Sequence, residues 1–231
     1  MEAQETERAE HALWIRKDDD REWSLDFMRE ELRAGFEVID RIDRPAVTVF
    51  GSARLGPGDP WYERARHLGE ALASEELAVV TGGGPGLMEA ANRGAQEAGG
   101  LSVGFGIELP LEQKLNAWLD LSFEFRHFYA RKVCFVKAAE AFVVLPGGWG
   151  TNDELFEALT LLQTEKVRHF PVFLLGSEHW RPFFDWGERL VQQGMIAADD
   201  LELVSLTDEP DEAVQSVAAC IRGDCAHMIG S

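Results

Sequence analysis

The chain has 231 residues, of which 45% are hydrophobic and 10% aromatic, which is enough apolar material for the core of one large domain. This composition excludes a fully disordered chain. The 41 acidic and 22 basic side chains give a formal net charge of −19, which repels nucleic acid and anionic membrane surfaces. We therefore expect neither as a partner.

The lack of a recognisable membrane span or signal peptide, together with the cysteine usage, predicts a cytoplasmic location. No apolar run approaches the roughly 18 residues that a membrane-spanning helix needs, and the first residues lack the basic and apolar regions of a signal peptide. The three cysteines, Cys134, Cys220 and Cys225, are an odd and sparse set. They favour reduced thiols over a disulfide framework.

The chain divides into four predicted parts. Residues 1–20 are rich in charge and poor in large apolar side chains, which predicts a mobile acidic tail. In residues 21–44 the apolar positions recur at three- and four-residue steps, which predicts an amphipathic helix that packs on the domain or on a second subunit. Residues 45–223 have the texture of a single α/β domain, and residues 224–231 are expected to be flexible.

Short aliphatic runs alternate with helical patterns through this domain. The strands are predicted at Ala46–Phe50, Ala78–Thr81, Leu101–Phe105, Leu121–Phe125, Ala141–Leu145 and Pro171–Leu175. The helices are predicted at Trp61–Ser74, Pro85–Ala98, His127–Ala139, Thr151–Thr164, His179–Gln193 and Asp211–Ile221. This order predicts a Rossmann-like, doubly wound parallel sheet with helices on both faces, whose ligands bind at the carboxyl ends of the strands.

Two of these strands run into glycine-rich turns that each precede a helix. One turn is Thr81–Glu89 and the other is Pro146–Thr151, and the exposed amides of such turns favour a phosphate. Neither turn matches the dinucleotide fingerprint or a P-loop. A single turn of this kind serves close helix packing about as often as it binds a ligand. Two such turns in one sheet favour a ligand site.

The segment between the turns reverses the sign of the chain's charge. Residues 124–137 carry four basic side chains and one acidic one, which suggests an anionic ligand. The fork of Arg131 suits a phosphate or a sugar hydroxyl, although Arg131 and Lys132 could instead pair with surface acids. Thr151 and Glu154 have the spacing of a helix capping box, in which Glu154 bonds back to the Thr151 amide. The spacing by itself favours this structural role, but a carboxylate at this position could also contact ribose or activate water.

These motifs together resemble the Lonely Guy family. The resemblance rests on Phe128-Tyr129-Ala130-Arg131-Lys132, followed by the P-G-G-x-G-T-x-x-E pattern of residues 146–154, and it extends from about Val47 to Cys220. The family consists of cytokinin riboside 5′-monophosphate phosphoribohydrolases, often labelled putative lysine decarboxylases. Decarboxylation would need a Schiff-base lysine, and none of the five lysines lies in a motif that identifies one.

The resemblance implies hydrolysis of the N-glycosidic bond of a nucleoside 5′-monophosphate, without a metal or an organic cofactor. It implies a homodimer with the site near the subunit boundary, and it places the catalytic pair on Arg131 and Glu154. It implies that substrate and phosphate are bound by residues of the turns and their surroundings, namely Ser52, Gly82, Gly83, Gly84, Gly86, Lys132, Gly147, Gly148, Gly150 and Thr151.

Some features leave the substrate and the reaction open. Phe128 stands where many members carry Met, and Trp149 fills the variable position of the motif, so an ordinary purine nucleotide such as AMP is also a candidate substrate. The main alternative is a non-catalytic nucleotide or cofactor carrier on the same fold. Cys220, Cys225 and His227 lack a fourth ligand and the usual spacing of a metal site, so no metal is expected.

Overall fold

The computed structural model describes residues 25–109, 114–167 and 170–224. It contains one seven-stranded sheet whose neighbouring strands all pair in parallel. The strands are β1 (Ala46–Phe50), β2 (Ala78–Thr81), β3 (Ser102–Ile107), β4 (Leu121–Phe125), β5 (Ala141–Val144), β6 (Val172–Leu175) and β7 (Ser205–Thr207). Their order is β4-β3-β2-β1-β5-β6-β7, so the chain winds outward in both directions from β1 and β5. The predicted doubly wound parallel sheet is confirmed.

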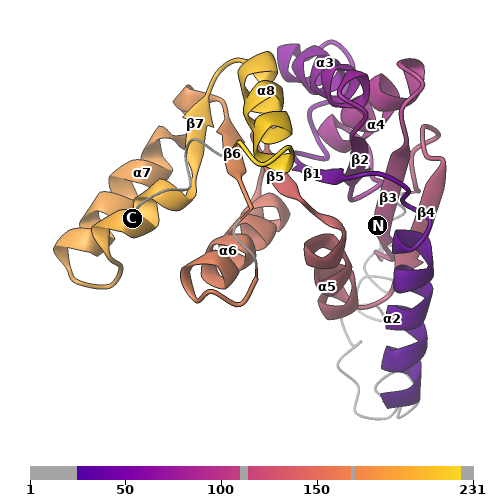
Figure 1. Cartoon of the computed structure of the whole chain (residues 1–231), viewed down its shortest axis with the longest axis horizontal. Coiled ribbons are helices and arrows are strands. Elements are labelled where there is room, and N and C mark those ends of the chain that lie inside the picture. The colour runs from indigo at the N-terminus through magenta and orange to yellow at the C-terminus, as the bar shows by residue number, and fades with distance from the viewer. Residues whose placement is uncertain (1–24, 110–113, 168–169, 225–231) are drawn as a thin grey trace, which may run out of the picture.

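Helices cover both faces of this sheet (Figure 1). One layer contains α3 (Pro60–Ser74), α4 (Leu87–Glu97) and α8 (Pro210–Ile221). The opposite layer contains α2 (Leu25–Ile39), α5 (Phe128–Ala138), α6 (Trp149–Gln163) and α7 (Ser177–Gln192). A separate apolar core fills each interface between helices and sheet, which explains why β5 is buried at every position.

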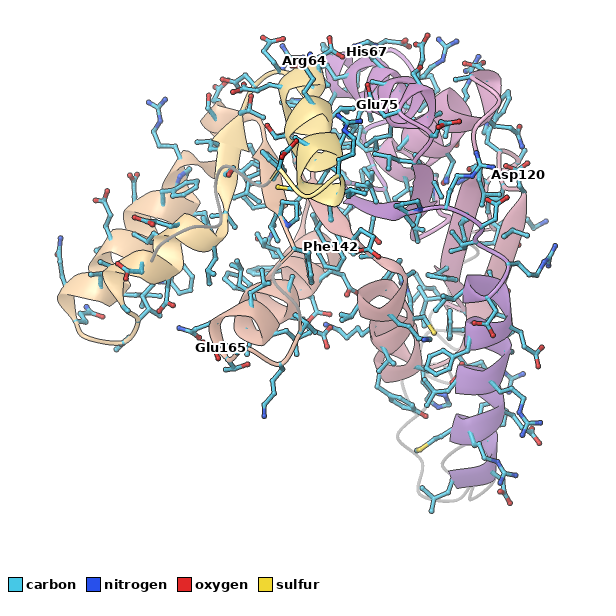
Figure 2. The ribbon with its side chains drawn as sticks, in the orientation of Figure 1. Arg64, His67, Glu75, Asp120, Phe142 and Glu165 are labelled. Carbon is cyan, nitrogen blue, oxygen red and sulfur yellow. The ribbon has the colours of Figure 1, made fainter. Side chains whose placement is uncertain are left out.

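Side-chain contacts stabilise the layers on both faces of the sheet, and Phe142 and Glu75, which take part in two of them, are labelled in Figure 2. Phe142 of β5 packs edge-on against Phe50, with ring centroids 5.2 Å apart, on the side that α5 and α6 cover. On the other side α8 is tied to α3 by an ion pair between Arg222 and Glu75, with 2.9 Å between nitrogen and oxygen. Apolar packing under the helices and an ion pair at the surface thus both hold the helices in their layers.

Two elements near the C-terminus escaped the sequence prediction. They are β7 and a 3₁₀ helix at Ala198–Leu203. A three-residue edge strand carries too few apolar positions to stand out, and it is defined by its pairing with β6. The predicted tail 1–20 and residues 225–231 lie outside the described residues, and the domain boundaries stay predictions.

The cysteines differ from expectation in one respect. Cys134 is free and buried, but Cys220 is disulfide-bonded, so the prediction of reduced thiols is wrong for Cys220. Among the described residues, no helix is long and apolar enough to cross a membrane.

Candidate functional site

A cavity of about 690 Å³ opens at the carboxyl ends of the strands. It lies where the strand order reverses between β1 and β5, which is the usual ligand site of a doubly wound sheet. The loops after β1, β2, β3 and β5 form its walls together with the first turns of α5 and α6. The predicted site residues that line it are Ser52, Gly82, Gly83, Gly84, Arg131, Gly148, Gly150, Thr151 and Glu154.

Helix α6 begins earlier than the sequence suggested. Its N-cap is Gly148, and the amide of Asn152 donates to the Gly148 carbonyl at 3.0 Å, so Thr151 already lies within the first turn. The capping box of Thr151 and Glu154 is therefore wrong, because Thr151 is not the residue before the helix. The first amides of α6 have no partner within the helix, and they lie in the wall of the cavity.

Glu154 is a buried carboxyl at this wall. Its relative exposure is 6%, and burial raises its pKa to about 7, although the nearby cations Lys132 and Arg131 act in the opposite direction. At neutral pH the group is therefore present in both protonation states. A carboxyl with this pKa can donate or accept a proton at little cost, which is what a general acid or base needs.

Arg131 is a cation in the same cavity, half-buried as a whole but with its Nε fully buried. Its guanidinium lies over the ring of Phe135, 4.9 Å from the centroid, and its Nε has no hydrogen-bond partner within the part of the chain that the structure describes. Burial lowers the pKa of Arg131, while Glu154 and Asp153 act to raise it. A buried guanidinium with an unused donor would gain from an anionic ligand in the cavity.

Lys132 has a different environment from its neighbour Arg131. Its ammonium lies 3.0 Å from Asp153, 2.9 Å from Glu157 and 4.0 Å from Glu154, and it does not line the cavity. Burial acts to lower the pKa of Lys132, but its bonds to Glu157 and Asp153 outweigh burial and raise it. The sequence left open that both cations pair with acids. Within the described residues, Lys132 forms such ion pairs, whereas no ion pair of Arg131 is found.

Two predicted glycines support the turns from behind and do not line the cavity. Gly86 has a φ of +72°, and a Cβ there would lie 2.4 Å from the Ser52 carbonyl oxygen. A Cβ at Gly147 would lie 2.1 Å from the hydroxyl of Thr151. Both positions therefore require glycine for close packing, and contact with a ligand is not needed to explain them.

Several lining residues were not predicted. Arg54, Lys114 and Glu124 add two cations and one carboxylate to the wall. They come from the β1 loop, from the segment before β4 and from β4 itself, and they meet because β1 and β4 end at the same edge of the sheet. No local pattern marks them in the sequence.

Among the described residues, no group of three or more His, Cys, Asp or Glu side chains could hold a metal ion.

The cavity combines a buried carboxyl of near-neutral pKa, a buried guanidinium and a helix N-terminus. This combination defines an α/β protein with a site suited to an anionic small molecule.

The family model described as "Possible lysine decarboxylase" matches residues 88–217, which is more than half of the chain. The chain belongs to this family, the Lonely Guy (LOG) family.

Similar proteins support this assignment. A cytokinin riboside 5′-monophosphate phosphoribohydrolase of Rhodococcoides fascians is 29% identical over 175 residues, which cover 74% of this chain and 88% of the relative. A protein of the same name from Arabidopsis thaliana is 26% identical over 176 residues, which cover 74% of this chain and 80% of the relative.

Solved structures share the fold. The molybdenum cofactor binding protein of Rippkaea orientalis aligns with a TM-score of 0.57 and 24% identity, over 78% of this chain and 99% of that one. The molybdenum cofactor carrier protein of Chlamydomonas reinhardtii aligns with a TM-score of 0.56 and 22% identity, over the same shares. At these identities the likeness concerns the fold alone.

Proposed function

We propose that this protein is a phosphoribohydrolase, which cleaves the N-glycosidic bond of a nucleoside 5′-monophosphate to release the free base and ribose 5-phosphate. The observation that carries the proposal is the buried carboxyl of Glu154, with a pKa of about 7, in one cavity with the buried guanidinium of Arg131. The names of the relatives from Rhodococcoides fascians and Arabidopsis thaliana support the reaction class.

The chemistry places positive charge on the ribose. As the bond from C1′ to the base nitrogen breaks, the sugar becomes an oxocarbenium-like cation, which the ionised form of Glu154 stabilises. The same carboxylate orients a water molecule toward C1′ and accepts its proton, while the hydroxide bonds to C1′. The base leaves with the bonding electron pair and takes up a proton from solvent, and Glu154 then returns its proton to solvent. Arg131 orients the substrate and offsets negative charge, and the phosphate supplies binding energy remote from the broken bond.

Aromatic side chains at the cavity suit a purine base. Phe128 and Trp149 both line the cavity, and their relative exposures of 40% and 93% leave their rings open to a ligand. We propose that the base stacks on one of these rings, which admits both AMP and a cytokinin nucleotide.

A second proposal concerns assembly. Val133 of α5 and Phe156 of α6 are 46% and 39% exposed, on the helices that also carry the exposed Phe128 and Trp149. Exposed apolar side chains on two neighbouring helices support a homodimer formed through α5 and α6. Sedimentation equilibrium should give a mass of about twice 25.8 kDa, and a monomer at micromolar concentration would contradict the proposal.

The activity test is release of ribose 5-phosphate and free base from a panel of nucleoside 5′-monophosphates that includes AMP and N6-isopentenyl-AMP. Glu154→Gln and Arg131→Ala should each abolish turnover. Glu178→Gln, which changes an exposed carboxylate outside the cavity, should keep it. Tight nucleotide binding without base release from any panel member would favour the carrier function and refute the hydrolase.

A further inference from the structure

A buried polar network lies beneath the glycine turn that follows β2. Asn92 of α4 has no exposed surface and is at its centre. Its Oδ1 accepts from the Thr81 hydroxyl at 2.6 Å and from the Asn116 side-chain amide at 3.0 Å. Its Nδ2 donates to the Ser102 hydroxyl at 2.9 Å and to the Val103 carbonyl at 3.3 Å. The Asn92 amide thus uses both donors and both lone pairs, which makes its position rigid.

This network holds the backbone of the turn at three points. The Thr81 hydroxyl accepts from the amide of Gly83 at 2.9 Å. The backbone amide of Asn116 donates to the Gly83 carbonyl at 2.8 Å, and its side chain donates to the Gly84 carbonyl at 3.1 Å. Two carbonyl oxygens of the turn are therefore directed toward Asn116, which does not line the cavity, whereas Gly83 and Gly84 do.

The orientation of these carbonyls decides what the turn offers to a ligand. In a trans peptide the amide points opposite to the carbonyl, so holding the Gly83 carbonyl against Asn116 directs the Gly84 amide away from Asn116. An inward carbonyl would repel an anion, whereas an inward amide binds it. The Arg131 guanidinium borders the same turn, because its Nη2 lies 2.6 Å from the place that a Cβ on Gly82 would occupy.

We propose that Thr81, Asn92 and Asn116 are positioning residues that hold the glycine turn in the conformation that binds the substrate's phosphate. They act by turning the carbonyls of Gly83 and Gly84 away from the cavity, which leaves the Gly84 amide available to the anion in a turn that Arg131 borders at Gly82. This inference rests on the proposed function, since it assigns the turn to the phosphate of the same substrate.

The test compares Thr81→Val with Thr81→Ser. Valine keeps the shape but removes the hydroxyl, whereas serine retains it. The control is Thr207→Val at the end of β7, where the Thr207 hydroxyl likewise accepts the amide two residues later, from Glu209 at 3.1 Å. Calorimetry measures the dissociation constants of ribose 5-phosphate, which cannot be hydrolysed, and of adenosine, which has no phosphate.

Thr81→Val should weaken ribose 5-phosphate binding about tenfold, the equivalent of one hydrogen bond, and leave adenosine binding unchanged. Thr81→Ser and Thr207→Val should bind both as the wild type does. Asn116→Ala keeps the backbone bond to Gly83 and should show the same selective loss, which provides the test if Thr81→Val fails to fold.

Equal weakening for both ligands, or unchanged affinity in Thr81→Val and Asn116→Ala, would overturn the inference. So would a wild-type protein that does not bind ribose 5-phosphate. A wild type that binds ribose 5-phosphate but releases no base would refute the proposed hydrolase, and the selective loss in Thr81→Val would still support the positioning role.

Discussion

Glu154 should make the stability of the protein depend on pH. Its pKa is raised from the ordinary 4.5 to about 7, chiefly by burial, so the folded protein holds this proton over a range in which the unfolded chain has lost it. Stability therefore falls as the pH rises from about 4.5 toward 7, and at higher pH the loss is complete. Each unit of pKa shift corresponds to about 1.4 kcal/mol, so the rise from 4.5 to about 7 means that ionising Glu154 lowers the free energy of unfolding by about 3 kcal/mol.

Glu154→Gln removes this cost, because the amide does not ionise. Urea unfolding of both proteins at several pH values gives the difference in their free energies of unfolding. Between pH 5 and pH 8 this difference should move by about 2 to 3 kcal/mol in favour of the variant. Subtracting the two proteins cancels the titration of every other group that the substitution leaves undisturbed.

The control variant is Glu178→Gln, which changes an exposed carboxylate outside the cavity and leaves Glu154 and its charged neighbours in place. It should keep the pH dependence of the wild type. Stability curves of wild type and Glu154→Gln that stay parallel from pH 5 to pH 8 would refute the reasoning, because they would show that the folded state imposes no cost on the ionised carboxyl.

Three further predictions follow from single positions. Gly83→Ala should lower the free energy of unfolding by about 1 to 2 kcal/mol because φ is +66°, whereas Gly150→Ala, with open space around the new methyl, should not lower it in the same urea titration. Glu31→Ala should cost about 2 to 3 kcal/mol in thermal unfolding, since the backbone amide and the ring of the buried His127 bond to the Glu31 carboxylate at 3.1 Å and 2.9 Å, and a loss below 1 kcal/mol would contradict this. Burial raises the pKa of Cys134 to about 12, so its thiol should resist alkylation at pH 8 until the protein unfolds, and rapid labelling of the native protein would disprove the burial.

Local patterns were sufficient for most of the fold. Ala46–Phe50 and Ala78–Thr81 have the predicted bounds, because a buried parallel strand reads as a short apolar run between turns. The alternation of strands and helices then left few topologies, and the right-handed crossover rule favours the doubly wound one. The edge strand Ser205–Thr207 lacks such a run, and its pairing with β6 defines it.

The site was predictable as a set of motifs but not as an arrangement. Residue types and spacing singled out Arg131, Lys132 and Glu154, yet they did not distinguish the two cations. Adjacent helical residues point about 100° apart, so Arg131 enters the cavity while Lys132 turns to the acids of α6. That difference depends on where α6 packs beside α5.

The sequence by itself determined the order of the first six strands and of the α-helices between them, the two glycine turns and the family motif, because each depends on residues close together in the chain. The tertiary structure decided the near-neutral pKa of Glu154, the burial of Arg131 and the meeting of Asn92 with Asn116 under the turn. Desolvation and hydrogen bonding between distant segments exist only once the sheet has brought those segments together.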